Sequence, residues 1–173
     1  TYKPANYYIY GPIADIINPD CYPQVTGQPA TQIREVVETC RYGAGPRPVT
    51  FTFSSTLEGD RDPEKFEKMR FPRAYFPLEE RVMLYYAIGA GARGLYNYIH
   101  CTENSERRWS RGSTDWPELW NEIGRVYREL DQVAPLLSLA HPTKLATSDQ
   151  EKLWLRTLLC GEDAALIVWV NDN

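Results

Sequence analysis

The sequence lacks the charge and hydropathy patterns of several large classes of protein. Its 19 Lys and Arg face 23 Asp and Glu, so it has no basic excess and carries a net charge of −4. A nucleic-acid or anionic-lipid surface attracts proteins through a basic patch, which this composition does not supply. No apolar run approaches the roughly 20 residues that cross a bilayer. We therefore expect neither nucleic acid nor a membrane among the partners.

Cysteine is scarce and scattered. Cys21, Cys40, Cys101 and Cys160 form no CxxC or Cys/His pair at the spacing of a structural zinc site. We expect no metal and no other cofactor. Spacing alone leaves open whether any two of these cysteines form a disulfide, and it leaves the redox compartment open as well.

What the chain does contain is enough apolar material for a folded core. Its 173 residues are 43% hydrophobic and 13% aromatic, which is a globular composition. The first residue, Thr1, is preceded by no initiator Met and followed by no basic-then-apolar signal pattern. We expect a cut inside a longer chain, with a processed end as the alternative.

The stretch from Pro77 to His100 predicts a helix followed at once by a buried strand. Pro77 suits the first helical turn, and Glu79 and Glu80 lie where a helix N-terminus favours negative charge. Alanines and glycines then end the helix, where glycine adopts the left-handed cap and small residues permit close packing on a sheet. The strand, Leu95–His100, becomes polar toward its carboxyl end.

The segments on either side of this stretch complete three strand-then-helix units. The strands expected there are 13–17 and 48–53, and the helices are 32–42 and a long helix from Asp115 to Leu137. The buried face predicted for that long helix consists of Trp116, Trp120, Ile123, Tyr127, Leu130 and Leu137. The charged connection 61–76 predicts a surface excursion with a short helix at 63–69, or a functional loop beside the sheet.

Three such units in a row imply parallel strands joined by helices, an α/β fold. After His141 the pattern changes to short alternating segments, which predict antiparallel strands at 143–147, 153–158 and 164–170. We therefore expect two parts, residues 1–141 and 142–173.

Five stretches together resemble the last three β/α units of a (β/α)8 barrel from a retaining-type glycoside hydrolase, followed by the start of its C-terminal β-sandwich. They are ADIINPDCYP, GPRPVTFTFSS, PLEERVMLYYAIGAGARGLYNYIH, WPELWNEIGRVYRELDQVAPLL and EKLWLRTLLCGEDAALIVWVNDN. The resemblance implies a partial TIM barrel whose N-terminal half is missing, including the acid/base carboxylate expected before Thr1. It also implies an extracellular or periplasmic location.

Polar and aromatic residues at the carboxyl ends of the predicted strands form the candidate carbohydrate site. In a parallel α/β sheet ligands bind at that edge, and sugars are held by carboxylates, amides and aromatic faces. The candidates are Asp20, Tyr22, Ser54, Asn97, Tyr98 and His100. The alternatives stay open: a loop cap for the aspartate, core packing for the tyrosines, and backbone hydrogen bonds for the asparagine and histidine.

The resemblance implies a nucleophilic Glu at the tip of the strand 48–53. That tip reads Ser54-Ser55, and the nearest carboxylate is Glu58, so Glu58 is the candidate nucleophile. A surface glutamate is the alternative interpretation.

The expected function is hydrolysis of O-glycosidic bonds, with this fragment inactive alone. The alternative is a carbohydrate-binding or structural barrel that has lost its catalytic carboxylates. Two carboxylates about 5–5.5 Å apart would favour a retaining hydrolase.

Overall fold

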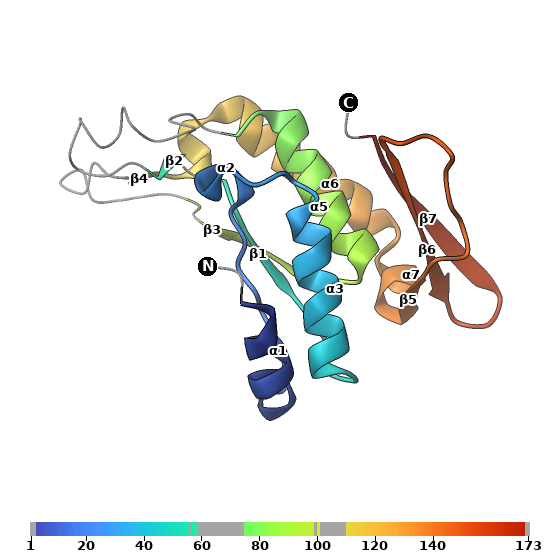
Figure 1. The fold of residues 1–173 in the computed structure, drawn as a ribbon. Coiled ribbons are helices and arrows are strands. Elements are labelled where there is room, and N and C mark those ends of the chain that lie inside the picture. The colour runs from blue at the N-terminus through green and yellow to red at the C-terminus, as the bar shows by residue number, and fades with distance from the viewer. Residues whose placement is uncertain (1–2, 56, 59–74, 99, 101–109, 172–173) are drawn as a thin grey trace.

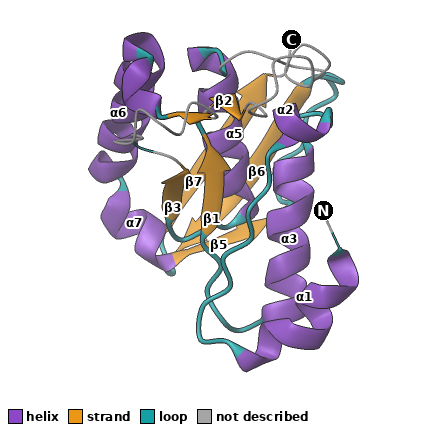
Figure 2. Ribbon diagram, turned by 90° about the vertical axis from the view of Figure 1, so that its left-hand side faces the viewer, coloured by secondary structure: helices purple, strands orange, loops and turns teal. Residues whose placement is uncertain are grey.

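A computed structural model describes residues 3–55, 57–58, 75–98, 100 and 110–171. It shows a mixed α/β protein in three layers (Figures 1 and 2): a small parallel sheet, a layer of helices, and an antiparallel sheet formed by the C-terminal strands. The helix layer therefore separates two sheets. No described helix is long and apolar enough to cross a bilayer.

Helices predominate in the first part of the chain, and strands predominate at its end. The N-terminal half contains α1 (Pro4–Tyr10), η1 (Gly11–Ile13), α2 (Pro23–Thr26), α3 (Gln32–Ala44), β1 (Phe51–Ser54), β2 (Leu57–Glu58) and α5 (Pro77–Ala90). The C-terminal half contains β3 (Leu95–Tyr98), β4 (Ser110–Arg111), η2 (Ser113–Asp115), α6 (Pro117–Gln132), α7 (Ala134–Leu139), β5 (Ala140–Thr143), β6 (Leu153–Cys160) and β7 (Ala164–Asn171).

The parallel sheet is built on β1, which pairs with neighbours on both of its edges. On one side β3 runs parallel to it, with Phe51 opposite Leu95. On the other side two parallel bridges, Ile17 to Val49 and Asp20 to Thr52, align the segment 17–21 with β1. The three parallel segments therefore lie side by side in chain order, as the sequence predicts.

Among the described residues, helices pack against one face of this sheet and leave the other face open. Phe51 and Phe53 are fully buried in the core that also holds Leu84 of α5 and Val37 of α3. Because side chains alternate across a strand, the residues between them point to the opposite face. Tyr96, in register with Thr52 on that face, is 55% exposed.

Helix α5 lies between the two sheets, and glycine permits its close approach to the second. A Cβ at Gly89 would lie 2.7 Å from the ring of Trp154 on β6, so a larger residue there would have to displace that ring. Gly91 caps α5 in the left-handed conformation with a φ of 105°. This confirms the prediction that small residues end the helix and allow tight packing on a sheet.

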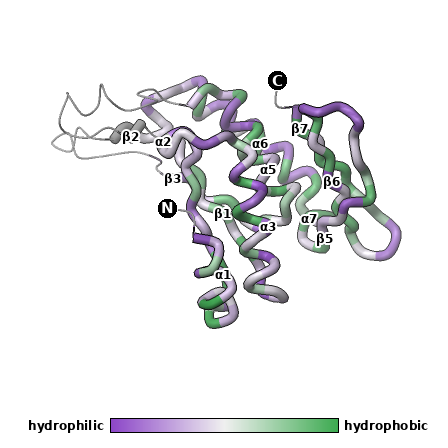
Figure 3. The backbone as a smooth tube through the Cα atoms, viewed as in Figure 1, coloured by the Kyte–Doolittle hydropathy of each residue, from purple (hydrophilic) through white to green (hydrophobic). Residues whose placement is uncertain are grey.

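The antiparallel sheet has the strand order β5-β6-β7 and buries one face against the helices. Leu158, Val168 and Val170 are buried on that inner face. On the outer face Ile167 is 62% exposed and Trp169 is 64% exposed. Figure 3 shows the hydrophobic stretches that run along β6 and β7. The outer face is therefore apolar although it is exposed.

Helices α5 and α6 are joined by an ion-pair network. Arg81 donates to Glu122 at 2.6 Å and to both carboxylate oxygens of Glu129 at 2.6 and 2.7 Å. Tyr85 also donates to Glu129, at 2.6 Å. The hydrogen bonds from Arg81 and Tyr85 lower the pKa of Glu129 to about 2. These contacts fix α6 beside α5.

Three predicted elements differ from the structure. The strand 13–17 is wrong over most of its length, because Pro12 helps start the turn η1 and sheet pairing begins only at Ile17. The long helix begins at Pro117, where proline suits the first turn, and breaks at Val133 into α6 and α7. The strand predicted at 143–147 is wrong beyond its first residue, because β5 spans Ala140–Thr143 and residues 144–147 form no strand.

The buried face of α6 also differs from the predicted one. Leu119, Ile123 and Val126 are buried, whereas Trp120 and Tyr127 are 40% and 41% exposed. Large aromatic residues lie at the margins of this helix, where each ring packs partly on its neighbours. The short helix predicted at 63–69 lies outside the described residues, and the division after His141 stays a prediction.

Candidate functional site

The carboxyl ends of the segment 17–21, β1 and β3 lie together at one end of the parallel sheet. Asp20 is paired with Thr52, so their side chains lie on the open face of the sheet. Asn18, two residues before Asp20, lies on the same face and exchanges hydrogen bonds with the hydroxyl of Thr52 at 2.9 and 3.2 Å. A carboxylate, an amide and a hydroxyl therefore lie together on an exposed surface.

An aromatic pair borders these polar groups. The rings of Tyr22 and Tyr98 are stacked with centroids 5.9 Å apart and planes 19° apart. Both residues are half-buried. Tyr22 follows the segment 17–21 and Tyr98 ends β3, so the pair spans the edge above β1. The part of these rings that stays exposed offers an apolar surface with a polar tip, which suits a sugar ring.

Ser54 lies beside this pair and is buried. It is in register with Tyr98, so it shares the open face of the sheet. Its hydroxyl has no hydrogen-bond partner among the described residues. Buried polar groups normally have a partner, and one without a partner at the mouth of a sheet is available to a ligand hydroxyl.

Asn97 lies on the opposite face of the sheet from Tyr98. Its side-chain oxygen accepts a hydrogen bond from Ser55, and its amide donates to Ser113 at 2.9 Å. These bonds tie β1 and β3 to the turn that precedes α6. Asn97 thus holds the edge of the sheet together from the helix side, and it does not belong to the candidate site.

His100 is exposed and lies next to α6. Its ring centroid is 4.9 Å from that of Trp120. Its carbonyl accepts hydrogen bonds from the hydroxyl of Thr114 at 3.0 Å and from the hydroxyl of Ser113 at 3.3 Å. The histidine therefore has a structural role at the start of α6, and its contact with a ligand stays a prediction.

Glu58 belongs to the short strand β2, which pairs antiparallel with β4 opposite Ser110. This pairing places the backbone of Glu58 after the carboxyl end of β1. Its side chain lies outside the described part of the structure, as do residues 59–74 and 101–109. The role of Glu58 as a nucleophile stays a prediction.

Sequence reasoning missed Asn18, Thr52 and Tyr96 as members of the open face. The alternation of threonine with phenylalanine in 50–53 was the available signal. Once the phenylalanines are assigned to the core, the threonines must face the other way. The described residues contain no group of three His, Cys, Asp or Glu side chains that could hold a metal ion.

Three of the four cysteines lie in the described part of the chain, and none of these three is in a disulfide. Cys21, Cys40 and Cys160 are buried free thiols. Burial raises the pKa of Cys21 and of Cys40 to about 12, so neither thiol is an activated nucleophile.

Comparison with known proteins adds no assignment. No protein-family model matches the chain, and no curated protein is significantly similar to it.

Proposed function

We propose that this chain is the C-terminal part of a (β/α)8 barrel of the glycoside hydrolase type, and that its open face binds a carbohydrate. The observation that carries the proposal is the parallel sheet of three segments, which the described helices cover on one face only. In a complete barrel the second face of such a sheet is the interior, and its carboxyl end is the active-site mouth.

The sheet edges and faces support the barrel part of the proposal. Among the described residues, neither the segment 17–21 nor β3 has a second sheet neighbour. Sheets avoid exposed parallel edges, and a barrel removes them by closure. The missing N-terminal half of the barrel would supply the neighbours. The exposed outer face around Ile167 and Trp169 would be covered by the other sheet of a β-sandwich.

The chemistry of the open face supports a carbohydrate ligand. Asp20 and Asn18 supply hydrogen-bonding groups for sugar hydroxyls, and Tyr98 and Tyr22 supply ring faces. In a retaining reaction one carboxylate attacks the anomeric carbon while a second protonates the leaving oxygen. Glu58 would be the nucleophile, and the missing half of the barrel would provide the acid.

A second function, carbohydrate binding without hydrolysis, is favoured by the carboxylate count. Asp20 is the sole acidic residue in the three described parallel segments. Retaining hydrolysis needs two carboxylates facing each other. A barrel without them would bind sugar at the same aromatic and polar face.

The experiment is turnover of aryl glycosides by a protein that joins this chain to its upstream half. Glu58→Gln should abolish turnover and leave sugar binding intact, because the change is nearly isosteric. Glu151→Gln, an exposed position on the loop before β6, is the matched control. Wild-type turnover in Glu58→Gln would remove Glu58 from the mechanism. Sugar binding without any wild-type turnover would establish the non-catalytic alternative.

A further inference from the structure

We propose a second binding site, for a phosphate-type oxyanion. It lies at the amino-terminal end of the parallel strands, whereas the carbohydrate site lies at their carboxyl end. A pocket of about 890 Å³ lies there, formed by the start of β1, the loop from α5 to β3, and helices α6 and α7. Its polar wall contains Arg41, Arg47, Arg93 and His141. We call these four residues the basic wall.

The three arginines of the basic wall are held in place by backbone carbonyls. Arg41 donates to the carbonyl of Ala90 at 3.1 Å, and Arg47 donates to the carbonyl of Pro12 at 3.2 Å. Arg93 donates to the carbonyl of Leu137. A guanidinium carries five N–H donors, and each of these bonds uses one. The remaining donors are available to a ligand.

Positive charge in the pocket is balanced only in part by carboxylates. None of the three arginines forms an ion pair with a described acidic residue, in contrast to Arg81, Arg125 and Arg156 elsewhere. Asp131 is the sole acidic residue among the described residues that line the pocket. An anion would supply the missing countercharge.

The arginines also act on one another. Burial lowers the pKa of Arg41; Tyr42 and Glu38 oppose this effect, and the positive charges of Arg93 and Arg156 add a smaller lowering. Like charges held close together in a partly buried pocket repel, and a bound dianion converts that repulsion into attraction. An anion bound in this pocket is therefore stabilised by more electrostatic free energy than an anion bound to an isolated surface arginine.

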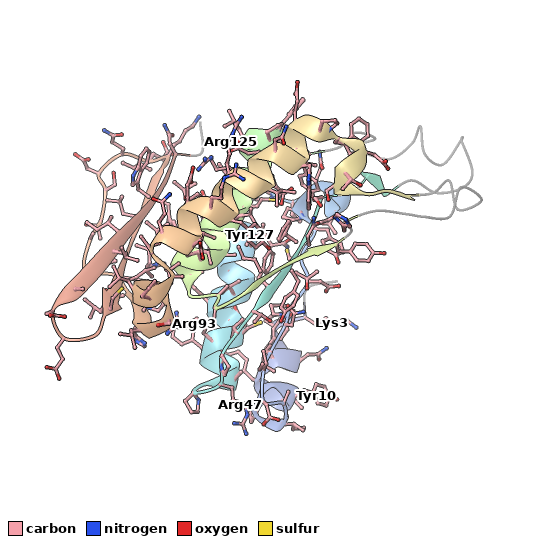
Figure 4. The ribbon with its side chains drawn as sticks, turned by 180° about the vertical axis from the view of Figure 1, so that it is seen from behind. Lys3, Tyr10, Arg47, Arg93, Arg125 and Tyr127 are labelled. Carbon is pink, nitrogen blue, oxygen red and sulfur yellow. The ribbon has the colours of Figure 1, made fainter. Side chains whose placement is uncertain are left out.

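The backbone is shaped to admit Arg41. Gly91 has a φ of 105°, and a Cβ there would lie 2.7 Å from Cδ and 2.8 Å from Nε of Arg41. Capping of the C-terminus of α5 explains the contact of Arg41 with Ala90. It does not explain why Arg47 and Arg93 line the same pocket, since neither caps α5. Figure 4 shows Arg47 at the bottom of the view beside Tyr10, and Arg93 above it, between Arg47 and Tyr127.

The ligand class follows from the donors and from the size of the pocket. Guanidinium groups match the planar oxygen pairs of phosphate in a bidentate way. The volume exceeds that of one phosphate, and Val49, Ile88 and Leu130 supply an apolar wall. A phosphate monoester of a small organic molecule fits both features.

The test is calorimetric titration of the 173-residue chain with inorganic phosphate, glycerol phosphate and glycerol, at constant ionic strength in chloride. We expect both phosphates to bind and glycerol not to bind. Tighter binding of glycerol phosphate would identify the ester as the preferred source. Equal binding would identify free phosphate. Absence of binding by either phosphate would overturn the proposal.

Variants separate the pocket from general surface charge. Arg93→Gln, at an exposed position, should weaken phosphate binding roughly ten-fold, because it removes a charge-assisted hydrogen bond. Asp131→Asn should strengthen binding. Arg128→Gln is the matched control, because Arg128 is exposed on α6 and outside the pocket. If Arg128→Gln weakened binding as much as Arg93→Gln, the phosphate would be bound by surface charge and the site would be refuted.

Discussion

Glu80 should make the stability of this protein fall as the pH rises. Its carboxyl group is fully buried on α5, and neither oxygen has a hydrogen-bond partner among the described residues. Burial raises the pKa of Glu80 well above its usual value, and the charge of neighbouring Glu79 raises it further. The folded protein therefore holds a proton that the unfolded chain releases.

The sign and slope of the change in stability with pH follow from this difference in proton binding. The stability that the protonated Glu80 carboxyl provides is fully present below its unfolded pKa of about 4.3 and is lost as the pH rises toward the folded pKa. Within that window the free energy of unfolding should fall by about 1.4 kcal/mol per pH unit. Glu80→Gln cannot ionise, so it should lack this slope.

The assay is urea unfolding of wild type and Glu80→Gln, followed by tryptophan fluorescence between about pH 4.5 and about pH 8. The buried amide costs about 1–3 kcal/mol at every pH, so the changing difference between the two proteins is the readout. Glu151→Gln, at an exposed position, should keep the wild-type slope. Parallel pH dependence of wild type and Glu80→Gln would refute the reasoning.

Three other predictions follow from the contacts of α5 and from burial of the thiols. Gly91→Ala should lower the free energy of unfolding by about 1–3 kcal/mol in urea titrations, because of its φ of 105°, whereas Gly124→Ala in α6 should raise it by up to about 1 kcal/mol. Arg81→Met should lower it by about 2 kcal/mol, because it removes hydrogen bonds to Glu122 and Glu129 while Glu122 keeps its ion pair with Arg125. Cys40 should resist alkylation in the native protein and react after unfolding, as peptide mass mapping can measure.

Each of these predictions has a contradicting outcome. Equal effects of Gly91→Ala and Gly124→Ala would mean that the left-handed cap carries no constraint. Arg128→Met is the control for Arg81→Met, and similar losses in the two variants would show that the ion-pair network contributes little. Rapid native-state alkylation of Cys40 would mean that α3 opens readily.

The parts of the fold that could be predicted are those with strong local signals. The alternation of Phe51 and Phe53 with threonine marks β1 by its period, and the glycines after Ala87 mark the end of α5. The phase of α6 could not be predicted from Trp120, because a large aromatic residue supports a buried or a marginal position equally well. Tertiary contacts decide which face of α6 is buried.

The helix α1 is another element that the sequence concealed. None of its residues is fully buried, although Tyr7 packs partly against the core. It packs on α3 where a Cβ at Gly43 would lie 2.8 Å from the backbone of Tyr7. Such a contact between backbones leaves no periodic signal in either segment.

The candidate site could be predicted in part, for the same reason as the strands. Asp20, Tyr22 and Tyr98 do meet at one edge, since parallel strands end together. Asn97 and Tyr98 are neighbours in one strand, so they cannot both point to the same face. That rule shows from the sequence alone that only one of the two can face the site, and the register of Asn97 with the buried Phe53 identifies Asn97 as the one that does not.

The central claim is that the open face of the parallel sheet binds carbohydrate, and backbone amide NMR tests it most directly. The chain would be titrated with a panel of monosaccharides and oligosaccharides. We predict saturable shifts of the amides of Asn18, Thr52 and Tyr98, with the Trp169 indole on the outer face of β7 unchanged. Shifts confined to Trp169 and its neighbours, or no saturable shift with any sugar in the panel, would contradict the claim.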